Sequence, residues 1–401
     1  MEGPMTQAPV VGVTGAGGFL GWHIHARLTL VEGLTVVVAH RDTFGSEEAL
    51  DRFVSSADVI VHAAGVNRPR DASDYSANVS MAEALVDAMH RTGRRVPVLY
   101  LNSVQTEADS QSTNPYAASK AEAADRLRGH QDDVDADFLD LVLPHVFGEF
   151  GQPNYNSAVA TFAWSVAAGR EPQINGHGQL ELVHAQDVAG RIVDFVRSGG
   201  ETVDFAESDG EGVRARERMK GREISVVDAW QMISRLHSRY VEDFTVPLCA
   251  DRFELQMFNM IRSHLYLADF YPQSLVNHAD DRGSFAEACR SDGLGQTSVS
   301  TTVPGISRGD HFHLEKIERF IVIGGSATIQ TRRVLTNEVK TFAVTGDEPV
   351  WIDMPPLTTH RIINTGSEIA TTLFWAADHF DAANPDTFPD PVHEPETGVD
   401  Q

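Results

Sequence analysis

The chain has 401 residues, 42% of them hydrophobic, which is enough for two or three domains with substantial cores. Its 57 acidic and 32 basic residues give a formal net charge of -25, which disfavours nucleic acid and anionic membranes as partners and favours small molecules or proteins. There is no N-terminal signal pattern, no run of ~18 apolar residues, and no Cys-x-x-Cys spacing between Cys249 and Cys289, so we expect a cytoplasmic protein in a reducing compartment.

Short apolar runs alternate with helical patterns over residues 10–145. This alternation predicts a Rossmann-type α/β fold, in which a doubly wound parallel sheet is covered by helices on both faces. The five expected strands are Val10 to Thr14, Leu34 to Ala39, Asp58 to Ala64, Val96 to Asn102 and Phe138 to Leu143.

A glycine-rich turn follows the first expected strand. Gly15, Gly18 and Gly21 allow tight bending, close approach of a phosphate and close helix packing. The next helix starts with Phe19 and Leu20 and directs its N-terminus at the pyrophosphate. A strand before the turn and a helix after it favour a dinucleotide site over a merely tight turn.

The second expected strand ends in His40-Arg41, where NAD enzymes carry a carboxylate that binds the ribose 2'-hydroxyl. An arginine can pair with the 2'-phosphate of NADP, so we expect NADPH as the cofactor. The neighbouring Asp42 keeps a second interpretation open, in which Arg41 is an ordinary solvated cation.

Ser103 follows the fourth expected strand, and Tyr116 and Lys120 lie one helical turn apart on one helix face. A phenol with a pKa near ~10 is a poor acid–base group at neutral pH, and we expect the adjacent ammonium to favour the phenolate. Ser103 could hold a carbonyl oxygen while Tyr116 exchanges a proton with it. An unrelated surface pair is the alternative, but the glycine turn and His62-Ala63-Ala64-Gly65 argue against coincidence.

With these motifs, the N-terminal half of the chain resembles the extended short-chain dehydrogenase/reductase family, whose members act mostly on nucleotide sugars. The resemblance implies that Ser103, Tyr116 and Lys120 are catalytic and that Asn78 supports the lysine through water. The cofactor-binding residues that it implies are Gly15, Gly18, Phe19, Leu20, Gly21, Arg41, Ala63, Ala64, Asn78 and Lys120. Dehydratases of the family carry an acid pair where this chain has Val104-Gln105, which leaves carbonyl reduction, alcohol oxidation or 4-epimerisation.

Polar residues follow the last strand of the nucleotide domain, where ligands bind in this fold. We expect His145, Asn154, Tyr155 and Asn156 to contact the substrate, although the last three could instead form a turn.

Helical patterns continue to the end of this region. Residues 158–169, 225–236 and 250–269 are expected helices, Asp187 is the expected N-cap of another, and residues 207–223 are expected to be a mobile loop or insertion. We place the reductase, with its sugar-nucleotide subdomain, at residues 1–279.

The character of the chain changes beyond Asp280, where β-branched and aromatic runs separated by turns predict an all-β barrel over residues 280–380. The expected strands include Gln296 to Thr302, Arg319 to Ile323, Ser326 to Arg332, Lys340 to Val344, Val350 to Ile352 and Ala370 to Trp375. Residues 381–401 are acidic and rich in proline, and we expect an extended arm or a disordered tail.

Within the β region, His311 and His313 alternate with Phe312, so a strand would direct both imidazoles to one side. Glu318 and His360 could complete a set of three histidines and one carboxylate around a divalent metal, with zinc as the expected ion. Without a metal, these histidines would bind sugar or act as general bases.

The spacing of these residues resembles the two cupin motifs. Gly305 and Gly325 fit the first motif, and Pro355 and Asn364 fit the second. Leu357 departs from the pattern, because the second motif has glycine there.

A reductase followed by a cupin resembles the CapF-type capsular polysaccharide enzymes over nearly the whole chain. The segments that carry this resemblance are Pro153-Asn154-Tyr155-Asn156-Ser157, Gly309-Asp310-His311-Phe312-His313 and Phe374-Trp375-Ala376. The resemblance implies that the cupin epimerises C3 of a UDP-2-acetamido-2,6-dideoxy-4-ketohexose and that the reductase then reduces C4 with NADPH, towards UDP-N-acetyl-L-fucosamine. It also implies that Lys316 assists proton transfer, a solvated strand-end cation being the alternative.

Two other functions stay open at this point. The chain could be a 4-ketoreductase or 4-epimerase of another nucleotide sugar whose cupin serves only docking and dimerisation, or an NADP-binding sensor or scaffold without turnover. Cupins and extended reductases usually pair, so we expect a homodimer.

Overall fold

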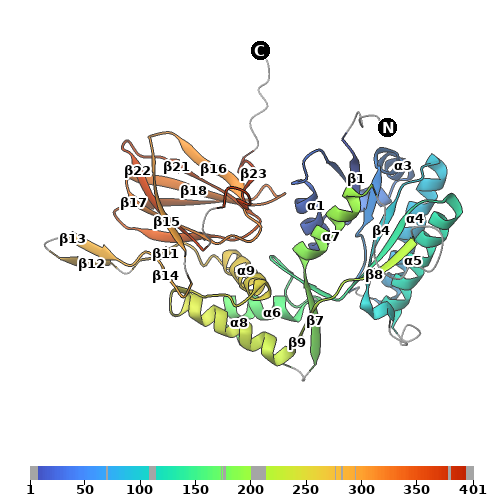
Figure 1. Ribbon diagram of the computed structural model, residues 1–401, viewed down its shortest axis with the longest axis horizontal. Helices are drawn as coiled ribbons and strands as arrows, with labels where there is room; N and C mark the ends of the chain where they lie inside the picture. Colours follow the sequence, from blue (N-terminus) through green and yellow to red (C-terminus); the bar gives the residue numbers. More distant parts are fainter. Residues whose placement is uncertain are drawn as a thin grey trace, which may run out of the picture. The chain divides into compact units, whose positions relative to one another are not determined.

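The computed structural model describes residues 8–68, 71–107, 114–172, 174, 178–199, 214–275, 277–280, 283–293, 295–377 and 381–393. Two predicted segments lie partly outside the described residues, namely residues 207–213 of the expected loop and residues 394–401 of the tail. By its internal contacts the chain divides into two units (Figure 1). The first is Met1–Phe147, Gln152–Ser157 and His177–Val226, and the second is Gly148–Gly151, Ala158–Gly176 and Val227–Gln401.

The first unit is built on a six-stranded sheet in which every neighbouring pair is parallel. Its strands, in sheet order, are β2 (Thr35–Ala39), β1 (Val10–Thr14), β3 (Val59–His62), β4 (Val98–Ser103), β5 (Phe138–Leu143) and β8 (Arg214–Arg218). The five expected strands are confirmed. The sixth, β8, corrects the prediction of a loop over residues 207–223, because an edge strand needs no apolar alternation and this one carries three arginines.

Helices cover both faces of this sheet (Figure 1). On one face α1 (Phe19–Leu28) and α7 (Ala185–Arg197) bury Ile24, Leu28 and Ile192 against it, and on the other α3 (Glu47–Ser56), α4 (Ser76–Thr92) and α5 (Pro115–Val134) form a second apolar core. The short elements are α2 (Arg41–Phe44) and the 3-10 turns Ala72–Tyr75 and Val104–Glu107. The expected doubly wound α/β fold is confirmed.

A small three-stranded sheet continues the first unit. It contains β6 (His145–Phe147), β7 (Gln179–His184) and β9 (Arg222–Ser225) in the order β6-β7-β9. The N-cap of α7 is His184, whose side chain accepts from the Gln186 backbone N–H, so the prediction that Asp187 caps this helix is wrong. Asp187 lies inside the first turn, where a carboxylate favours the helix dipole without serving as the cap.

Two five-stranded sheets form the β region of the second unit, a cupin-like antiparallel fold. One sheet runs β11 (Gln273–Ser274), β20 (Val350–Met354), β17 (Glu318–Gly324), β22 (Ala370–Ala376) and β15 (Gln296–Thr302), and the other runs β19 (Val339–Thr345), β18 (Ser326–Arg333), β21 (Thr358–Asn364), β16 (Ser307–Phe312) and β23 (Phe388–Pro389). Two-stranded pairs add β10 (Thr245–Val246) with β14 (Arg290–Ser291), and β12 (Asn277–Asp280) with β13 (Gly283–Ala286).

Three helices belong to the second unit by contact: α6 (Ala158–Ala167), α8 (Val226–Val241) and α9 (Arg252–Leu267). The buried Arg262 of α9 donates to the Met354 carbonyl at 2.8 Å, and Asn259 donates to the Glu315 carbonyl at 3.0 Å. The expected helices are present, but α8 and α9 group with the β region, whereas the sequence pattern puts the boundary at residue 279.

The described part of the tail is an ordered, extended arm. We call residues 381–393 the C-terminal arm. The arm includes β23, which pairs with β16, and its Val392 is 1% exposed. The described part of the tail is thus extended and paired with the sheet.

Candidate active sites

The glycine turn leaves space at the N-terminus of α1. Gly15 has a φ of +71°, and a Cβ there would lie 2.6 Å from the Ala64 backbone nitrogen. A Cβ on Gly21 would lie 2.1 Å from the Gly15 carbonyl oxygen, whereas one on Gly18 would find that oxygen at 3.4 Å. Gly15 and Gly21 are thus needed for the close packing of strand and helix, and the exposed Gly18 caps the helix without a side chain, which fits a pyrophosphate.

Side-chain hydrogen bonds connect the carboxyl ends of β1 and β3, next to the glycine turn. The Thr14 hydroxyl accepts from the Ala64 backbone N–H at 3.1 Å and lies 2.8 Å from His62 Nδ1. Burial, reinforced by the charge of Lys120, lowers the pKa of His62 to about 3, so this histidine is neutral. Ala63 and Ala64 are half-buried beside the turn, and so are Phe19 and Leu20 at the start of α1.

Arg41 and Asn78 occupy different environments. Arg41 is exposed in the first turn of α2, directly after β2, where a 2'-phosphate could reach it. Asn78 is 2% exposed, accepts from the Val66 N–H at 2.6 Å, and donates to the Val66 carbonyl and to Ser119 Oγ at 3.1 and 3.0 Å. These contacts are with the β3–α4 connection and α5, and a water link to Lys120 stays a prediction.

The Ser103 side chain lies near enough to the Tyr116 hydroxyl to lower the pKa of the phenol. Asn114 places the tyrosine, because its side chain caps α5 by accepting from the Tyr116 and Ala117 N–H groups at 3.1 and 3.3 Å. Burial raises the pKa of Tyr116 to about 12, and Ser103 opposes this only in part. The expectation of a favoured phenolate is wrong for the cofactor-free chain, since desolvation of Tyr116 dominates.

Lys120 is 5% exposed and lies one turn after Tyr116 on the same helix, α5. Its Nζ donates to the Leu101 carbonyl at 2.5 Å and lies 4.0 Å from the centre of the Tyr100 ring. Burial lowers the pKa of Lys120 to about 7, while Asp140 acts in the opposite direction. The lysine can therefore change charge near neutral pH.

A closed ring of hydrogen bonds that the sequence did not reveal holds the Ser103 peptide. The Ser103 N–H donates to Asn102 Oδ1 at 2.9 Å, and Asn102 Nδ2 donates to the fully buried Asp140 at 2.8 Å. Arg216 on β8 donates to Asp140 at 3.0 Å and to Thr106 Oγ1 at 2.9 Å, and Thr106 Oγ1 donates to the Ser103 carbonyl at 2.8 Å. The sequence feature that could have indicated this ring is Asp140, because a carboxylate inside a buried strand needs a cationic partner.

The expected substrate contacts form a turn, as the alternative interpretation had it. Residues 153–156 are a turn, Asn154 has a φ of +55°, and the Arg68 guanidinium donates to the carbonyls of Asn154 and Tyr155. The side chains of Asn154, Tyr155 and Asn156 are exposed, and Tyr155 is near enough to Tyr116 to affect its pKa. His145 is exposed at the start of β6, and substrate contact by any of the four stays a prediction.

The second unit brings His311, His313, Glu318 and His360 together. One ligand atom from each lies within 4.8 Å of the others. His311 pairs with His360 across β16 and β21, His313 follows β16, and Glu318 is the first residue of β17 in the other sheet. The sheets therefore assemble the cluster from two sequence-distant motifs.

The hydrogen bonds of this cluster suit a cation. His313 Nδ1 lies 2.5 Å from the Asp386 carbonyl and His360 Nδ1 lies 3.2 Å from the Thr358 carbonyl, so both rings carry their proton on Nδ1. Their Nε2 atoms then face the Glu318 carboxylate as acceptors at 3.0 and 3.7 Å, and the buried His360 Nε2 has no hydrogen-bond partner among the described residues. Acceptors this close repel one another unless a cation lies between them, and three imidazoles with a carboxylate suit zinc.

Burial and neighbouring groups shift the pKa values of His360 and Glu318. Burial, reinforced by His313 and His311, lowers the pKa of His360 to about 3. Burial alone would raise the pKa of Glu318, but its neighbour His313 outweighs this effect and brings the pKa to about 2. At neutral pH, His360 is therefore a neutral imidazole and Glu318 is a carboxylate.

Leu357 adopts the backbone conformation for which glycine is favoured. Its φ is +56°, its side chain is fully buried, and its N–H donates to the His313 carbonyl at 2.8 Å. The turn before His360 is thus formed despite the missing glycine, since side-chain burial offsets the left-handed strain.

Lys316 lies in the turn between His313 and Glu318. Its Nζ donates to the Pro385 carbonyl at 2.6 Å and lies 3.4 Å from Thr387 Oγ1, and its charge also acts on Glu318. It is therefore held by the C-terminal arm, and a role in proton transfer stays a prediction.

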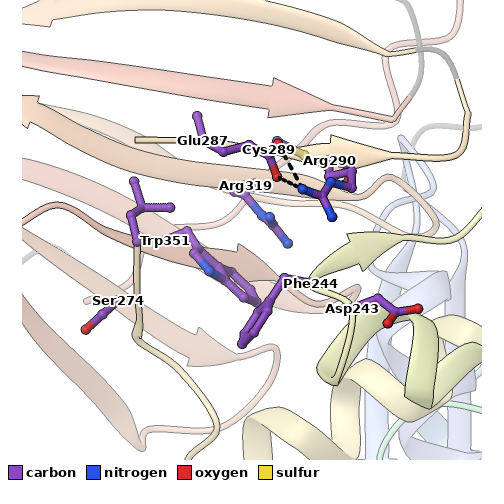
Figure 2. A pocket seen from close by; sticks show the side chains of 10 residues that line it. Asp243, Phe244, Ser274, Glu287, Cys289, Arg290, Arg319 and Trp351 are labelled. Carbon is purple, nitrogen blue, oxygen red and sulfur yellow. Dashed lines mark hydrogen bonds and ion pairs between the residues drawn. The ribbon is translucent and has the colours of Figure 1, made fainter. Parts of the chain in front are cut away.

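A cavity of about 340 Å³ lies elsewhere in the second unit (Figure 2). Its lining includes Trp351 and Arg319, and the four clustered ligands are not part of it. Arg319 is 2% exposed, donates to Asp353 at 2.8 Å, and stacks 3.8 Å above the Trp351 ring. This arrangement is a buried ion pair between facing residues of the adjacent strands β17 and β20.

Comparisons with known proteins agree with the two units. Residues 11–203 match the NAD dependent epimerase/dehydratase family, and residues 278–388 match the polysaccharide biosynthesis C-terminal domain. The UDP-2-acetamido-2,6-beta-L-arabino-hexul-4-ose reductase of Pseudomonas aeruginosa is 32% identical over 94% of this chain and 97% of its own length.

Solved structures give the same picture. The capsular polysaccharide assembling protein CapF from Staphylococcus aureus has a TM-score of 0.59 at 31% identity and covers 95% of this chain and 100% of its own. CapF with the inhibitor 3-isopropenyl-tropolone has a TM-score of 0.54 at 28% identity, covering 96% of this chain and 100% of its own. The UDP-N-acetylglucosamine 4-epimerase of Bacillus cereus shares the fold, with a TM-score of 0.50 at 14% identity over 65% of this chain and 97% of its own.

The fold and the matched family models define a nicotinamide-dependent short-chain dehydrogenase/reductase joined to a polysaccharide biosynthesis β domain. The chain belongs to the CapF-type family of capsular polysaccharide enzymes. Within the described part of the chain, no helix combines the length and apolarity that crossing a membrane requires.

Proposed function

We propose that this chain carries two consecutive reactions on a UDP-2-acetamido-2,6-dideoxy-4-ketohexose, epimerisation of C3 in the cupin-like unit and reduction of the C4 ketone with NADPH in the other. The observation that carries the proposal is the presence, in one chain, of a half-buried Ser103–Tyr116 pair with the buried Lys120, and of a separate cluster of three histidines and one glutamate. The related enzyme of Pseudomonas aeruginosa is a reductase of a UDP-linked hexul-4-ose, which supports the substrate class.

Reduction uses the high pKa of Tyr116. A phenol with a pKa near 12 is protonated at neutral pH and can donate to the C4 oxygen as it becomes an alkoxide. Ser103 holds the same oxygen, and protonated Lys120 stabilises the negative charge left on the tyrosine. A bound reduced nicotinamide supplies the hydride. Arg41 is the proposed 2'-phosphate partner, so Arg41→Ala should raise the KM for NADPH and leave that for NADH nearly unchanged.

Epimerisation uses the acidity that a C4 ketone gives to the C3 proton. A base removes that proton, the electron pair moves to the C4 oxygen, and reprotonation on the opposite face inverts C3. A divalent metal held by His311, His313, Glu318 and His360 would polarise the ketone oxygen. Lys316 is the proposed proton-transfer group, and it must leave the Pro385 carbonyl, 2.6 Å away, to reach a substrate.

A metal at this cluster, proposed to be zinc, has further support. CapF has been crystallised with the inhibitor 3-isopropenyl-tropolone. The adjacent oxygens of a tropolone chelate divalent ions, which suits a site with open coordination positions.

The test is one incubation with NADPH and a UDP-4-keto-6-deoxy-HexNAc in heavy water, read by NMR for C3 deuterium and product configuration. Tyr116→Phe should abolish NADPH oxidation and keep C3 exchange, and His311→Ala should do the reverse. Matched controls are Tyr75→Phe, whose ring lies 5.7 Å from Tyr116, and His393→Ala at the exposed end of the arm. Loss of both activities in either folded site variant would refute the division of labour, and a docking-only cupin would show no C3 deuterium in the wild-type protein.

A further inference from the structure

The C-terminal arm contacts the connection between two of the clustered ligands. The Asp386 carboxylate accepts the backbone N–H groups of Leu314, Glu315 and Lys316 at 2.9, 3.0 and 2.8 Å. These residues lie in the turn between His313 and Glu318. Three amides converging on one carboxylate fix the backbone of this turn, which sets the spacing of the two ligands.

The same residue of the arm also orients an imidazole. The Asp386 backbone carbonyl accepts from His313 Nδ1–H at 2.5 Å, so Nε2 is left free to bind an ion. Asp386 has a φ of +43°, which aims its carbonyl and its carboxylate at neighbouring groups. A left-handed backbone in a non-glycine residue persists only where its surroundings hold it.

The arm reaches the other two histidines through their neighbours. Strand β23 pairs with β16, with Pro389 opposite His311, and the Phe388 ring packs on Phe312 at 5.6 Å. The Asp390 carboxylate accepts from the Thr359 hydroxyl, one residue before His360. A single segment of the arm, 386–390, thus touches or adjoins each of the three histidines.

Arg332 of β18 binds the C-terminal end of the segment. Arg332 donates to Asp390 at 2.6 Å and to the Pro391 and Val392 carbonyls at 2.8 and 2.9 Å. The Val392 N–H in turn donates to the Asp310 carboxylate at 3.0 Å, next to His311. These contacts hold the segment at its C-terminal end, while Asp386 holds it at the other end.

We infer that the C-terminal arm is an integral part of the metal site, with Asp386 as the positioning residue that orients His313 and fixes the spacing between His313 and Glu318. The inference rests on the proposed function in one respect, which is that the four clustered residues bind a divalent ion. Hydrogen-bond partners of metal ligands typically contribute 10- to 100-fold to metal affinity.

The test measures zinc affinity of the full chain by competition with a chromogenic chelator, with no turnover involved. Asp386→Ala keeps the backbone carbonyl but removes the carboxylate that fixes both the turn and the position of that carbonyl against His313, so the Kd for zinc should rise by about 10- to 100-fold. The matched control is Asp381→Ala, which removes an exposed carboxylate of the same arm and should keep the wild-type Kd. Among the described residues, this carboxylate accepts the Ala383 N–H at 2.9 Å and contacts none of the clustered ligands. Asp386→Asn, which keeps one acceptor oxygen, should fall between the two.

Hydrogen exchange provides a second measurement that does not need the affinity. The amides of Leu314 to Lys316 should lose protection in Asp386→Ala and keep it in Asp381→Ala, with NADPH binding unchanged in both as a sign of folding. Wild-type zinc affinity with full protection in Asp386→Ala would overturn the inference alone. Failure of the wild-type chain to bind zinc, manganese, cobalt or nickel would instead overturn the metal part of the proposed function.

Discussion

Replacing Lys120 by methionine should stabilise the cofactor-free chain at neutral and acidic pH while abolishing reduction. The ammonium is 5% exposed, and burial lowers its pKa from an ordinary 10.5 to about 7. A fall of this size corresponds to roughly 5 kcal/mol at 1.36 kcal/mol per pKa unit. Methionine has a similar length and needs no proton, so it removes this cost and keeps the packing.

The sign of the pH dependence follows from the two pKa values. Between about pH 7 and 10.5 the unfolded chain holds the Lys120 proton and the folded chain has lost it, so the wild-type free energy of unfolding should rise with pH. Below about pH 7 both states hold the proton, and the full cost is present. Lys120→Met should therefore exceed wild type by about 3 to 5 kcal/mol near pH 6, and the difference should vanish near pH 10.

The assay is urea unfolding of cofactor-free protein near pH 6, 8 and 10, followed by circular dichroism and referred to Lys220→Met, a change at an exposed lysine of the same unit. A variant less stable than wild type near pH 6, or a difference that does not depend on pH, would refute the reasoning. Either result would mean that the Leu101 carbonyl and the Tyr100 ring compensate the buried ammonium fully.

Three further variants probe the turn, the cupin-like fold and the hydrogen-bonded ring. Gly21→Ala places a methyl group 2.1 Å from the Gly15 carbonyl oxygen, so we expect a loss of at least about 2 kcal/mol and weaker NADPH binding in a fluorescence titration; unchanged binding would show that α1 can move away. Leu357→Gly relieves roughly 1 kcal/mol of left-handed strain but loses a fully buried side chain, so a net loss of about 2 kcal/mol is expected, and a raised melting temperature would contradict it. Asp140→Asn breaks the ring around Ser103, so kcat should fall about tenfold with KM little changed, because the C4 oxygen is held less accurately; an unaltered kcat would mean that the ring is dispensable.

Local patterns in the sequence predicted much of the fold and both candidate sites. The apolar runs marked five strands of the first sheet, because parallel strands covered on both faces are apolar throughout. Tyr116 and Lys120 lie on one helix, so their spacing alone predicts that they share a helix face. His311 lies in β16 and His313 directly follows it, so their spacing predicts that both side chains point to the same side of the strand.

The sequence did not predict features that depend on contacts between residues far apart in the chain. Strand β8 is polar because it lies at a sheet edge, and its Arg216 meets Asp140 across 76 positions of the chain. Asp386 resembles a solvated acid of a proline-rich tail until its three backbone donors are known. The pKa of Tyr116 was predicted in the wrong direction because burial, which the sequence does not display, outweighs neighbouring charge.

The long separation along the chain between the arm and the turn has a consequence for metal release. The Asp386 carboxylate meets the Lys316 N–H across 70 positions of the chain, so this contact closes a long loop. Local unfolding of the arm can therefore precede global unfolding of the second unit. Zinc should then leave the cluster at a rate set by release of the arm, and urea concentrations below the global transition should already speed its loss.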